Sequence, residues 1–162
     1  MTDVHDTLVT VESSDLFLEF KKSHPKSYLV HAFSTGTMTQ MMPIELGYYE
    51  QDTIVVFHSD PIAQQPADKV FTDHEHALPQ LDIDAVRVGL QDALVLAEKE
   101  QRKEYAAHQV VKVICVLQQK ESPVWNMTLV TSTLHMLLLK LNAITGEVIS
   151  RELQNLMSLK KE

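Results

Sequence analysis

The densest apolar pattern lies between residues 124 and 151, where two strand-like runs and a turn follow one another with few residues between them. Residues 124–131 are rich in β-branched and aromatic side chains, and residues 134–141 form a nearly continuous apolar run. Only Ser132 and Thr133 separate the runs, which is a spacing typical of a β-hairpin. The pair Thr145-Gly146 then predicts a chain reversal, because glycine adopts positive φ at little cost.

Alternation along these runs predicts which side chains share a face of the sheet, since successive side chains of a strand point in opposite directions. One face of the first run holds Trp125, Met127 and Leu129. The other face holds Asn126, Thr128 and Val130, and it is polar enough to contact water or a partner. The second run is apolar on both faces. We expect a helix to cover one of them, and the C-terminal helix, the first half of the chain or a second subunit to cover the other.

A helix and a further strand are predicted ahead of this hairpin. Apolar residues at helical spacing begin at Leu90 and continue through Leu94 and Ala97, which predicts a helix over residues 90–105. Residues 110–118 form an apolar run that predicts a strand. We expect the helix to meet the alternate strand residues Val111, Val113 and Cys115. Weaker patterns predict a short strand within 82–88, and a strand end followed by a short helix within 148–159.

The first half shows the same order of elements. Residues 1–11 predict a loosely held tail with a short strand at 8–11. Ser14 is a candidate N-cap for a short helix that contains Phe17 and Phe20 and ends at His24-Pro25. Strands are predicted at residues 27–34, 44–49 and 53–58.

The fold class that follows is α+β, with two αβββ units in which a helix packs on a curled antiparallel sheet. Three of the six prolines fall within residues 60–81 and break every periodicity there. We therefore divide the chain into a first unit (residues 1–60), a linker (61–84) and a second unit (85–162), packed as one compact globule. Because the halves share only the order of their elements, an internal duplication is a hypothesis from element order.

The net charge and the composition of the chain argue against some classes of function, nucleic-acid binding among them. The formal net charge is -8, and residues 1–84 hold 4 Lys/Arg against 14 Asp/Glu while residues 85–162 hold 10 against 8. An acidic chain lacks the basic patch that binds nucleic acid or anionic membranes. Cys115 is the only cysteine, and it lies inside an apolar run, so we expect it to be buried and unreactive. The first residues show no signal-peptide pattern, and we predict a cytoplasmic protein.

The order of a helix with Asp92, Ala93, Leu94 and Ala97, a strand, a Trp125-Asn126-Met127 strand and an Asn142–Val148 turn (NAITGEV) resembles PepSY domains. These are small cystatin-like units of peptidase propeptides and of other bacterial and archaeal proteins. Asn142 stands where the family usually has Asp. The similarity is clearest over residues 85–150. It implies a cystatin-like unit there, a protein-binding or peptidase-inhibiting role, and no catalytic residues, and the shared element order suggests a degenerate copy in the first half.

Motifs for catalysis or cofactor binding are lacking in the sequence. No G-x-S-x-G, G-x-G-x-x-G or P-loop pattern occurs, and four glycines leave little room for a phosphate-binding loop. His74 and His76, with nearby aspartates, are the candidate metal ligands, since imidazole and carboxylate groups bind divalent metals. The alternative for this segment is a solvated loop. We expect no cofactor.

The leading hypothesis is therefore a non-catalytic protein- or peptide-binding module, peptidase-inhibitory or regulatory, with Trp125, Asn126, Thr128, Tyr48 and Tyr49 as candidate contact residues. The methionines Met38, Met41 and Met42 near the tyrosines could line a peptide groove or a dimer contact, because methionine adapts to different partners. The alternative function is a small-ligand or metal-binding domain with a pocket between sheet and helix. The sequence names no partner, and a homodimer is one option.

Overall fold

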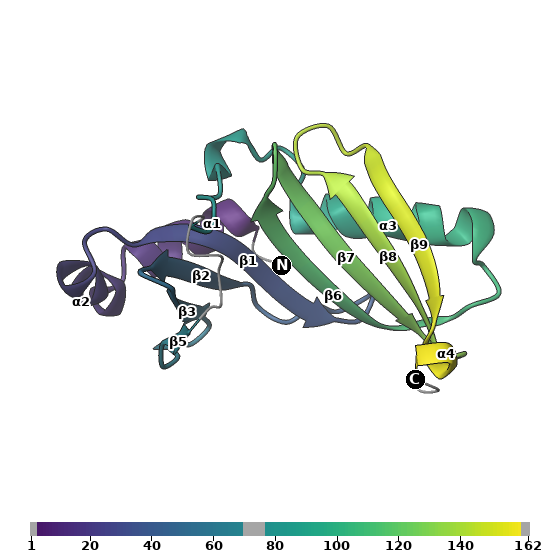
Figure 1. Ribbon diagram of the computed structural model, residues 1–162, viewed down its shortest axis with the longest axis horizontal. Helices are drawn as coiled ribbons and strands as arrows, with labels where there is room; N and C mark the ends of the chain where they lie inside the picture. Colours follow the sequence, from purple (N-terminus) through teal and green to yellow (C-terminus); the bar gives the residue numbers. More distant parts are fainter. Residues whose placement is uncertain (1–2, 70–76, 160–162) are drawn as a thin grey trace.

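The computed structural model describes residues 3–69 and 77–159 (Figure 1). Its first half contains two helices followed by strands, namely α1 (Val4–Glu12), α2 (Asp15–Ser23), β1 (Tyr28–Gly36), β2 (Glu45–Glu50), β3 (Thr53–Ser59), β4 (Ile62–Gln64) and β5 (Asp68–Lys69). Its second half contains the 3-10 helix η1 (Ile83–Ala85), α3 (Leu90–Glu104), β6 (Val110–Gln119), β7 (Pro123–Thr131), β8 (His135–Asn142), β9 (Val148–Asn155) and the short α4 (Leu156–Leu159). The fold is a mixture of helices and antiparallel sheet, as the sequence predicts.

The strands form one continuous antiparallel sheet in the order β4-β3-β2-β1-β6-β7-β8-β9, with β5 paired to β3. The two halves meet where β1 pairs with β6, so that Phe33 lies opposite Val116. Each half otherwise pairs its strands in sequence order. The junction between the halves is therefore made of main-chain hydrogen bonds within the sheet.

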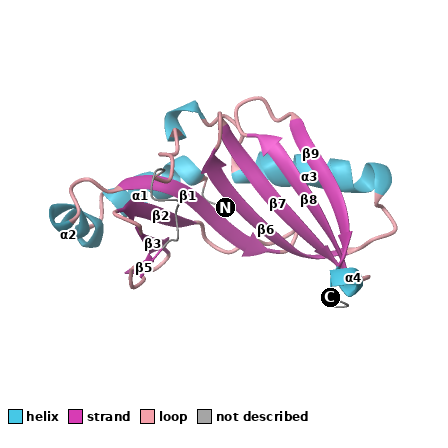
Figure 2. Cartoon of the chain, viewed as in Figure 1, coloured by secondary structure: helices cyan, strands magenta, loops and turns pink. Residues whose placement is uncertain are grey.

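Helices α1 and α3 lie on the same face of the sheet (Figures 1 and 2). Helix α2 packs on this side too, because Phe17 and Phe20 contact the rings of Tyr48 and Phe57 at centroid distances of 4.8–6.3 Å. Ser14 caps α2 by accepting a hydrogen bond from the Phe17 amide at 3.2 Å. Among the residues that the structure describes, no helix covers the opposite face.

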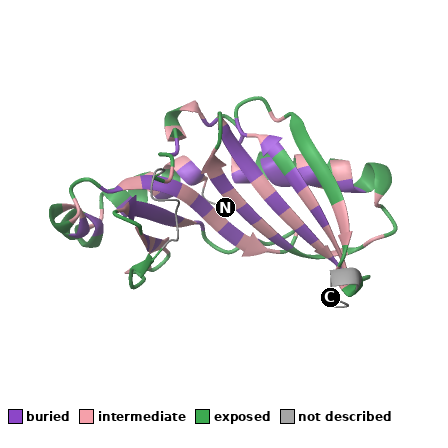
Figure 3. Ribbon diagram, viewed as in Figure 1, coloured by how far each residue is buried: buried purple, intermediate pink, exposed green. Residues whose placement is uncertain are grey.

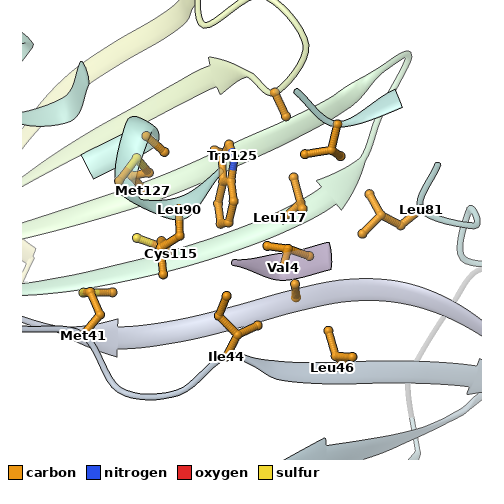
Figure 4. Packing of buried hydrophobic residues seen from close by; sticks show 14 of the residues in the cluster. Val4, Met41, Ile44, Leu46, Leu81, Leu90, Cys115, Leu117, Trp125 and Met127 are labelled. Carbon is orange, nitrogen blue, oxygen red and sulfur yellow. The ribbon is translucent and has the colours of Figure 1, made fainter. Parts of the chain in front are cut away.

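The core lies between the sheet and these helices as one cluster that runs through both halves (Figure 4). Leu90, Leu94 and Ala97 of α3 are buried in it, as predicted. Along most of β6, β7 and β8, buried residues alternate with more exposed ones, which gives these strands the banded pattern of Figure 3. The strand residues of the second half that belong to the core cluster are Val113, Cys115, Leu117, Trp125, Met127, Leu129, Leu137, Leu139 and Leu141.

Val111 departs from the predicted pattern. It is 47% exposed, whereas Val113 and Cys115 are fully buried. The pairing of β6 with β7 shifts between Val110 and Lys112, which leaves Val111 as the extra residue of a β-bulge. The bulge turns Val110 toward the core in its place.

The predicted N-terminal tail is wrong, because residues 4–12 form helix α1. Val4, Thr7 and Val11 are its buried residues, at the spacing of a helix that packs along one stripe. Five of its nine residues are valine or threonine, which favour strands when judged without tertiary contacts. Packing against the rest of the core outweighs that preference.

Described residues on both sides of positions 70–76, within the segment assigned as a linker, are hydrogen-bonded to the sheet. Strands β4 and β5 both pair with β3. Leu81 is 2% exposed, and its amide donates to the Leu29 carbonyl oxygen at 2.8 Å. The strand predicted within 82–88 is instead the single turn of η1. In the second half, β9 is a full strand of eight residues, so that half has four strands where three were expected.

Candidate functional site

Trp125 belongs to the core and offers no surface to a partner. Its side chain is 1% exposed and lies among the buried residues of α3, β6 and β7 (Figure 4). The indole Nε1 donates to the Val88 carbonyl oxygen at 2.8 Å. This hydrogen bond fixes the segment that leads into α3, because Gly89 is the N-cap of that helix.

The turn after β8 holds the same segment from another direction. Asn142 Oδ1 accepts from the amides of Ile144 and Thr145 at 2.8 and 3.0 Å, and Gly146 takes the positive φ of 83° that the turn requires. The Ala143 carbonyl oxygen accepts from the amides of Arg87 and Val88 at 2.9 and 2.8 Å. The conspicuous residues of the second half, Trp125 and the 142–147 turn, therefore position the start of α3.

Both predicted tyrosines are also buried, on opposite faces of β2. Tyr48 is 2% exposed, and its hydroxyl donates to Glu12 Oε2 of α1 at 2.9 Å. Burial first, and the neighbouring Glu12 carboxylate second, raise the pKa of Tyr48. Tyr49 is 5% exposed and donates to Asp52 Oδ1 at 3.0 Å. Direct contact with a partner would thus require movement of either ring.

The uncovered side of the sheet carries the other two predicted contact residues. Asn126 and Thr128 are half-buried there, at the centre of three rows of paired residues that cross β1 and β6–β9. We call this surface the open face. Its rows are Phe33, Val116, Asn126, Lys140 and Ser150; then Thr35, Ile114, Thr128, Leu138 and Glu152; and finally Lys112, Val130, Met136 and Gln154.

Asn126 has an unmet hydrogen-bonding group at the centre of the open face. Its Nδ2 is shielded from solvent and has no hydrogen-bond partner among the described residues. A buried amide group without a partner costs about 1–3 kcal/mol. Sequence reasoning finds Asn126 by alternation, but it does not find Phe33 or Val116 beside it, because the pairing of β1 with β6 is not visible in the local pattern.

A hollow of about 760 Å³ lies on the helix side, near the point where the halves meet. Its lining comes from α1, the β1–β2 connection, the end of β3 and the start of α3, namely Thr7, Thr10, Thr39, Gln40, Met41, Met42, Pro43, Ile44, Ser59, Asp60 and Gln91. Of the three methionines singled out in the sequence, Met41 and Met42 line it and Met38 does not, and neither Tyr48 nor Tyr49 is in the lining. We call it the α1 pocket.

The predicted metal ligands His74 and His76 lie outside the described residues. Within residues 3–69 and 77–159, no group of three or more His, Cys, Asp or Glu side chains is placed to hold a metal ion. The structure does bring together two histidines that the sequence leaves separate. The rings of His108 and His135 are 4.6 Å apart, and their Nδ1 atoms lie 2.7 and 3.1 Å from Thr133 Oγ1.

Burial shifts the pKa of two further titratable side chains, Cys115 and His31. Cys115 is fully buried as predicted, and burial raises the pKa of its thiol to about 12, so that the neutral thiol predominates. His31 packs its ring against Gly47, where a β-carbon would lie 2.2 Å from His31 Cε1. Burial lowers the pKa of His31, and Gly47 provides the space for its ring.

Comparison with known proteins gives a likeness of fold. No protein-family model matches the chain, and no curated protein does. A crystal structure from Clostridium difficile 630, described as that of a "putative lipoprotein", matches with a TM-score of 0.58 and 14% sequence identity over 86% of this chain and 91% of that one. At this identity the match shows that the overall fold occurs in that protein.

In the part of the chain that the structure describes, no helix combines the length and the apolar character that crossing a bilayer requires.

Proposed function

We propose that this protein is a non-catalytic protein- or peptide-binding module of the PepSY kind, and that its open face is the binding surface. The observation that carries the proposal is the composition of this face. It presents six half-buried apolar side chains in register, namely Phe33, Ile114, Val116, Val130, Met136 and Leu138, around the unpaired amide of Asn126. A contiguous apolar surface with a polar centre is typical of an interaction site.

The size of the open face favours a peptide or a small partner. Five strands at ~4.8 Å spacing and three rows at ~6.6 Å give a plan area of about 500 Å². A standard interface buries ~800 Å² on each partner, and obligate dimers bury more. A second copy of the chain remains an alternative occupant, and the subunit count by native mass spectrometry tests it.

The cystatin-like units and the duplication belong to this proposal. Each half places its longer helices before an antiparallel set of strands, and the first long strands of the halves, β1 and β6, meet at the centre. The residues that resemble the PepSY pattern, Trp125 and the 142–147 turn, act together on the start of α3. A sequence motif that contains no catalytic groups is expected to have a structural role, and these residues share one.

The binding role is tested with peptides selected on the wild-type protein from a displayed library. Leu138→Glu places a charge in the open face, and we expect it to weaken the selected peptides at least tenfold, because a buried unpaired carboxylate is costly. Val95→Glu is the matched control, since Val95 is 63% exposed on α3. Equal affinity for both variants, or the absence of any selectable peptide, would overturn the proposal.

The inhibitory version has its own assay. We expect the purified protein to slow cleavage by a thermolysin-type peptidase, and Leu138→Glu to relieve that inhibition while Val95→Glu does not. Unchanged peptidase rates at saturating protein would remove inhibition from the proposal and leave peptide binding to be judged by the selection experiment.

The proposal keeps the predicted cytoplasmic location. The lipoprotein description belongs to the structural neighbour, and fractionation of cells that produce the full-length protein distinguishes a cytoplasmic from a membrane-anchored form.

A further inference from the structure

The α1 pocket is separate from the open face, because α1 and α3 lie on the other side of the sheet (Figure 1). One wall is helix α1, which contributes Thr7 and Thr10. The opposite wall is the β1–β2 connection with the end of β3, and Gln91 of α3 closes one side. A volume of about 760 Å³ is within the range of small-molecule sites.

Among the described residues that line it, a single one is charged, namely Asp60 with its carboxylate. Within residues 3–69 and 77–159, no lysine, arginine or histidine lines the pocket. The half of the chain that supplies most of the lining is strongly acidic, with 4 Lys/Arg against 14 Asp/Glu in residues 1–84. The electrostatics of the pocket therefore favour a cation and oppose an anion.

Thr7 gives an independent indication of a ligand. It is 1% exposed, and its hydroxyl has no hydrogen-bond partner among the described residues, although it lies in the lining of the pocket. The main-chain amide of Thr7 does have a hydrogen-bond partner, because it donates to the Asp3 carbonyl oxygen at 2.9 Å. A hydroxyl left unpaired in this way retains two acceptor lone pairs for an incoming donor.

The remaining walls suit an aliphatic chain. Ile44 and Met41 are buried at 3% and 8% exposure and form apolar lining, and Met42 is 63% exposed. Methionine side chains adapt to alkyl groups of different shapes. Ser59 donates its hydroxyl proton to the Ile44 carbonyl oxygen at 3.3 Å, which leaves its oxygen lone pairs free to accept.

From these observations we infer that the α1 pocket binds an alkylammonium group, either the side chain of a lysine in a peptide or a free aliphatic amine. An ammonium group has three N–H donors and no acceptor. Asp60 supplies the opposite charge, the hydroxyls of Thr7 and Ser59 accept the remaining protons, and Met41 and Met42 contact the alkyl chain.

The test follows the methyl resonances of Met41 and Met42 in the full-length protein, labelled at the methionine methyl carbon. The probes are n-butylamine, Nα-acetyl-lysine methylamide and, as the anion of similar size, butyrate. We expect saturable shifts of both resonances with the amines and none with butyrate. Tighter binding of the lysine derivative assigns a peptide as the source, and equal or tighter binding of butylamine assigns a free amine.

Substitutions locate the site. Asp60→Asn and Thr7→Val each remove an acceptor for the ammonium group, and we expect each to weaken amine binding about tenfold, as for one charge-assisted hydrogen bond. Asp68→Asn is the control, because Asp68 is exposed on β5 away from the pocket lining. Loss of affinity in Asp60→Asn with normal affinity in Asp68→Asn supports the inference.

The inference would be overturned by shifts of equal size with butyrate, by unchanged amine affinity in Asp60→Asn, or by no shift with any amine.

The outcome of this experiment is independent of the open face. Leu138→Glu is expected to keep amine binding, and Asp60→Asn to keep the selected peptides, so that either proposal can fail alone.

Discussion

Tyr48 is a single residue that joins a helix to the sheet. Its ring packs against Phe17 and Phe57, and its hydroxyl donates to Glu12 of α1. Both the burial of the phenol and the nearby carboxylate disfavour the phenolate. The folded protein therefore holds the Tyr48 proton more tightly than the unfolded chain does.

This residue makes stability depend on alkaline pH. The folded pKa of Tyr48 is raised above the unfolded value of about 10, so the stabilisation is present below pH 10 and is lost as pH rises further. Tyr48→Phe should lower the free energy of unfolding by about 1 kcal/mol at pH 8, through loss of the hydrogen bond to Glu12. The deficit should shrink above pH 10 in urea titrations. Cys115 titrates in both proteins and cancels, and a deficit that is constant with pH would refute the explanation.

For single residues, some predictions from the sequence are correct and others are not. Alternation correctly buried Met127 and Leu129 and correctly put Asn126 and Thr128 on the other face. It also put Trp125 on the face of Met127 and Leu129, but it did not indicate that Trp125 and Tyr48 have internal hydrogen-bond partners, because an aromatic residue with a polar group suits both cores and interfaces. The partners, the Val88 carbonyl and Glu12, are distant in sequence.

At the scale of elements, the 142–147 turn connects β8 to β9 and holds the approach to α3. The side chain of Asn142 organises the turn through two amides, and the Ala143 carbonyl receives two more from residues 87 and 88. An aspartate at position 142 offers the same acceptor oxygen.

Two substitutions at Asn142 test whether the turn depends on the acceptor oxygen of this side chain. Asn142→Asp should unfold at nearly the wild-type temperature, because the carboxylate accepts from the same amides. Asn142→Ala should lose about 1–2 kcal/mol, since two turn amides lose their acceptor. Thermal unfolding followed by circular dichroism measures both. Equal destabilisation by the two substitutions would show that Asn142 acts through its amide nitrogen instead.

Element prediction succeeded where apolar periodicity was strong and local. Strands β6, β7 and β8 and helix α3 lie where the pattern put them. Helix α1 was missed because its valines and threonines favour strands, and its helical form depends on burial against distant residues. The bulge at Val111 and the α1 pocket were also beyond the sequence, since both depend on which strands become neighbours.

At the scale of the whole molecule, the halves are joined by the pairing of β1 with β6 and by a common core. Opening this junction would leave two strand edges without hydrogen-bond partners and expose part of that core. Such a cost favours unfolding of both halves together.

Spectroscopic probes in each half test this cooperativity. Trp125 is the only tryptophan and reports on the second half, while three of the four tyrosines, Tyr28, Tyr48 and Tyr49, lie in the first. Tryptophan fluorescence and near-ultraviolet circular dichroism of the tyrosines should give the same urea midpoint. Two separated midpoints would show that the halves are independent domains.

The position of β6 in the chain also affects how the protein is made. Residues 37–109 lie between the end of β1 and the start of β6, and at 5–20 residues per second their synthesis takes about 4–15 s. During that interval the nascent first half presents β1 as a bare edge strand, which is a template for pairing with other chains. Newly made chains on the ribosome are thus expected to need protection by chaperones until β6 emerges.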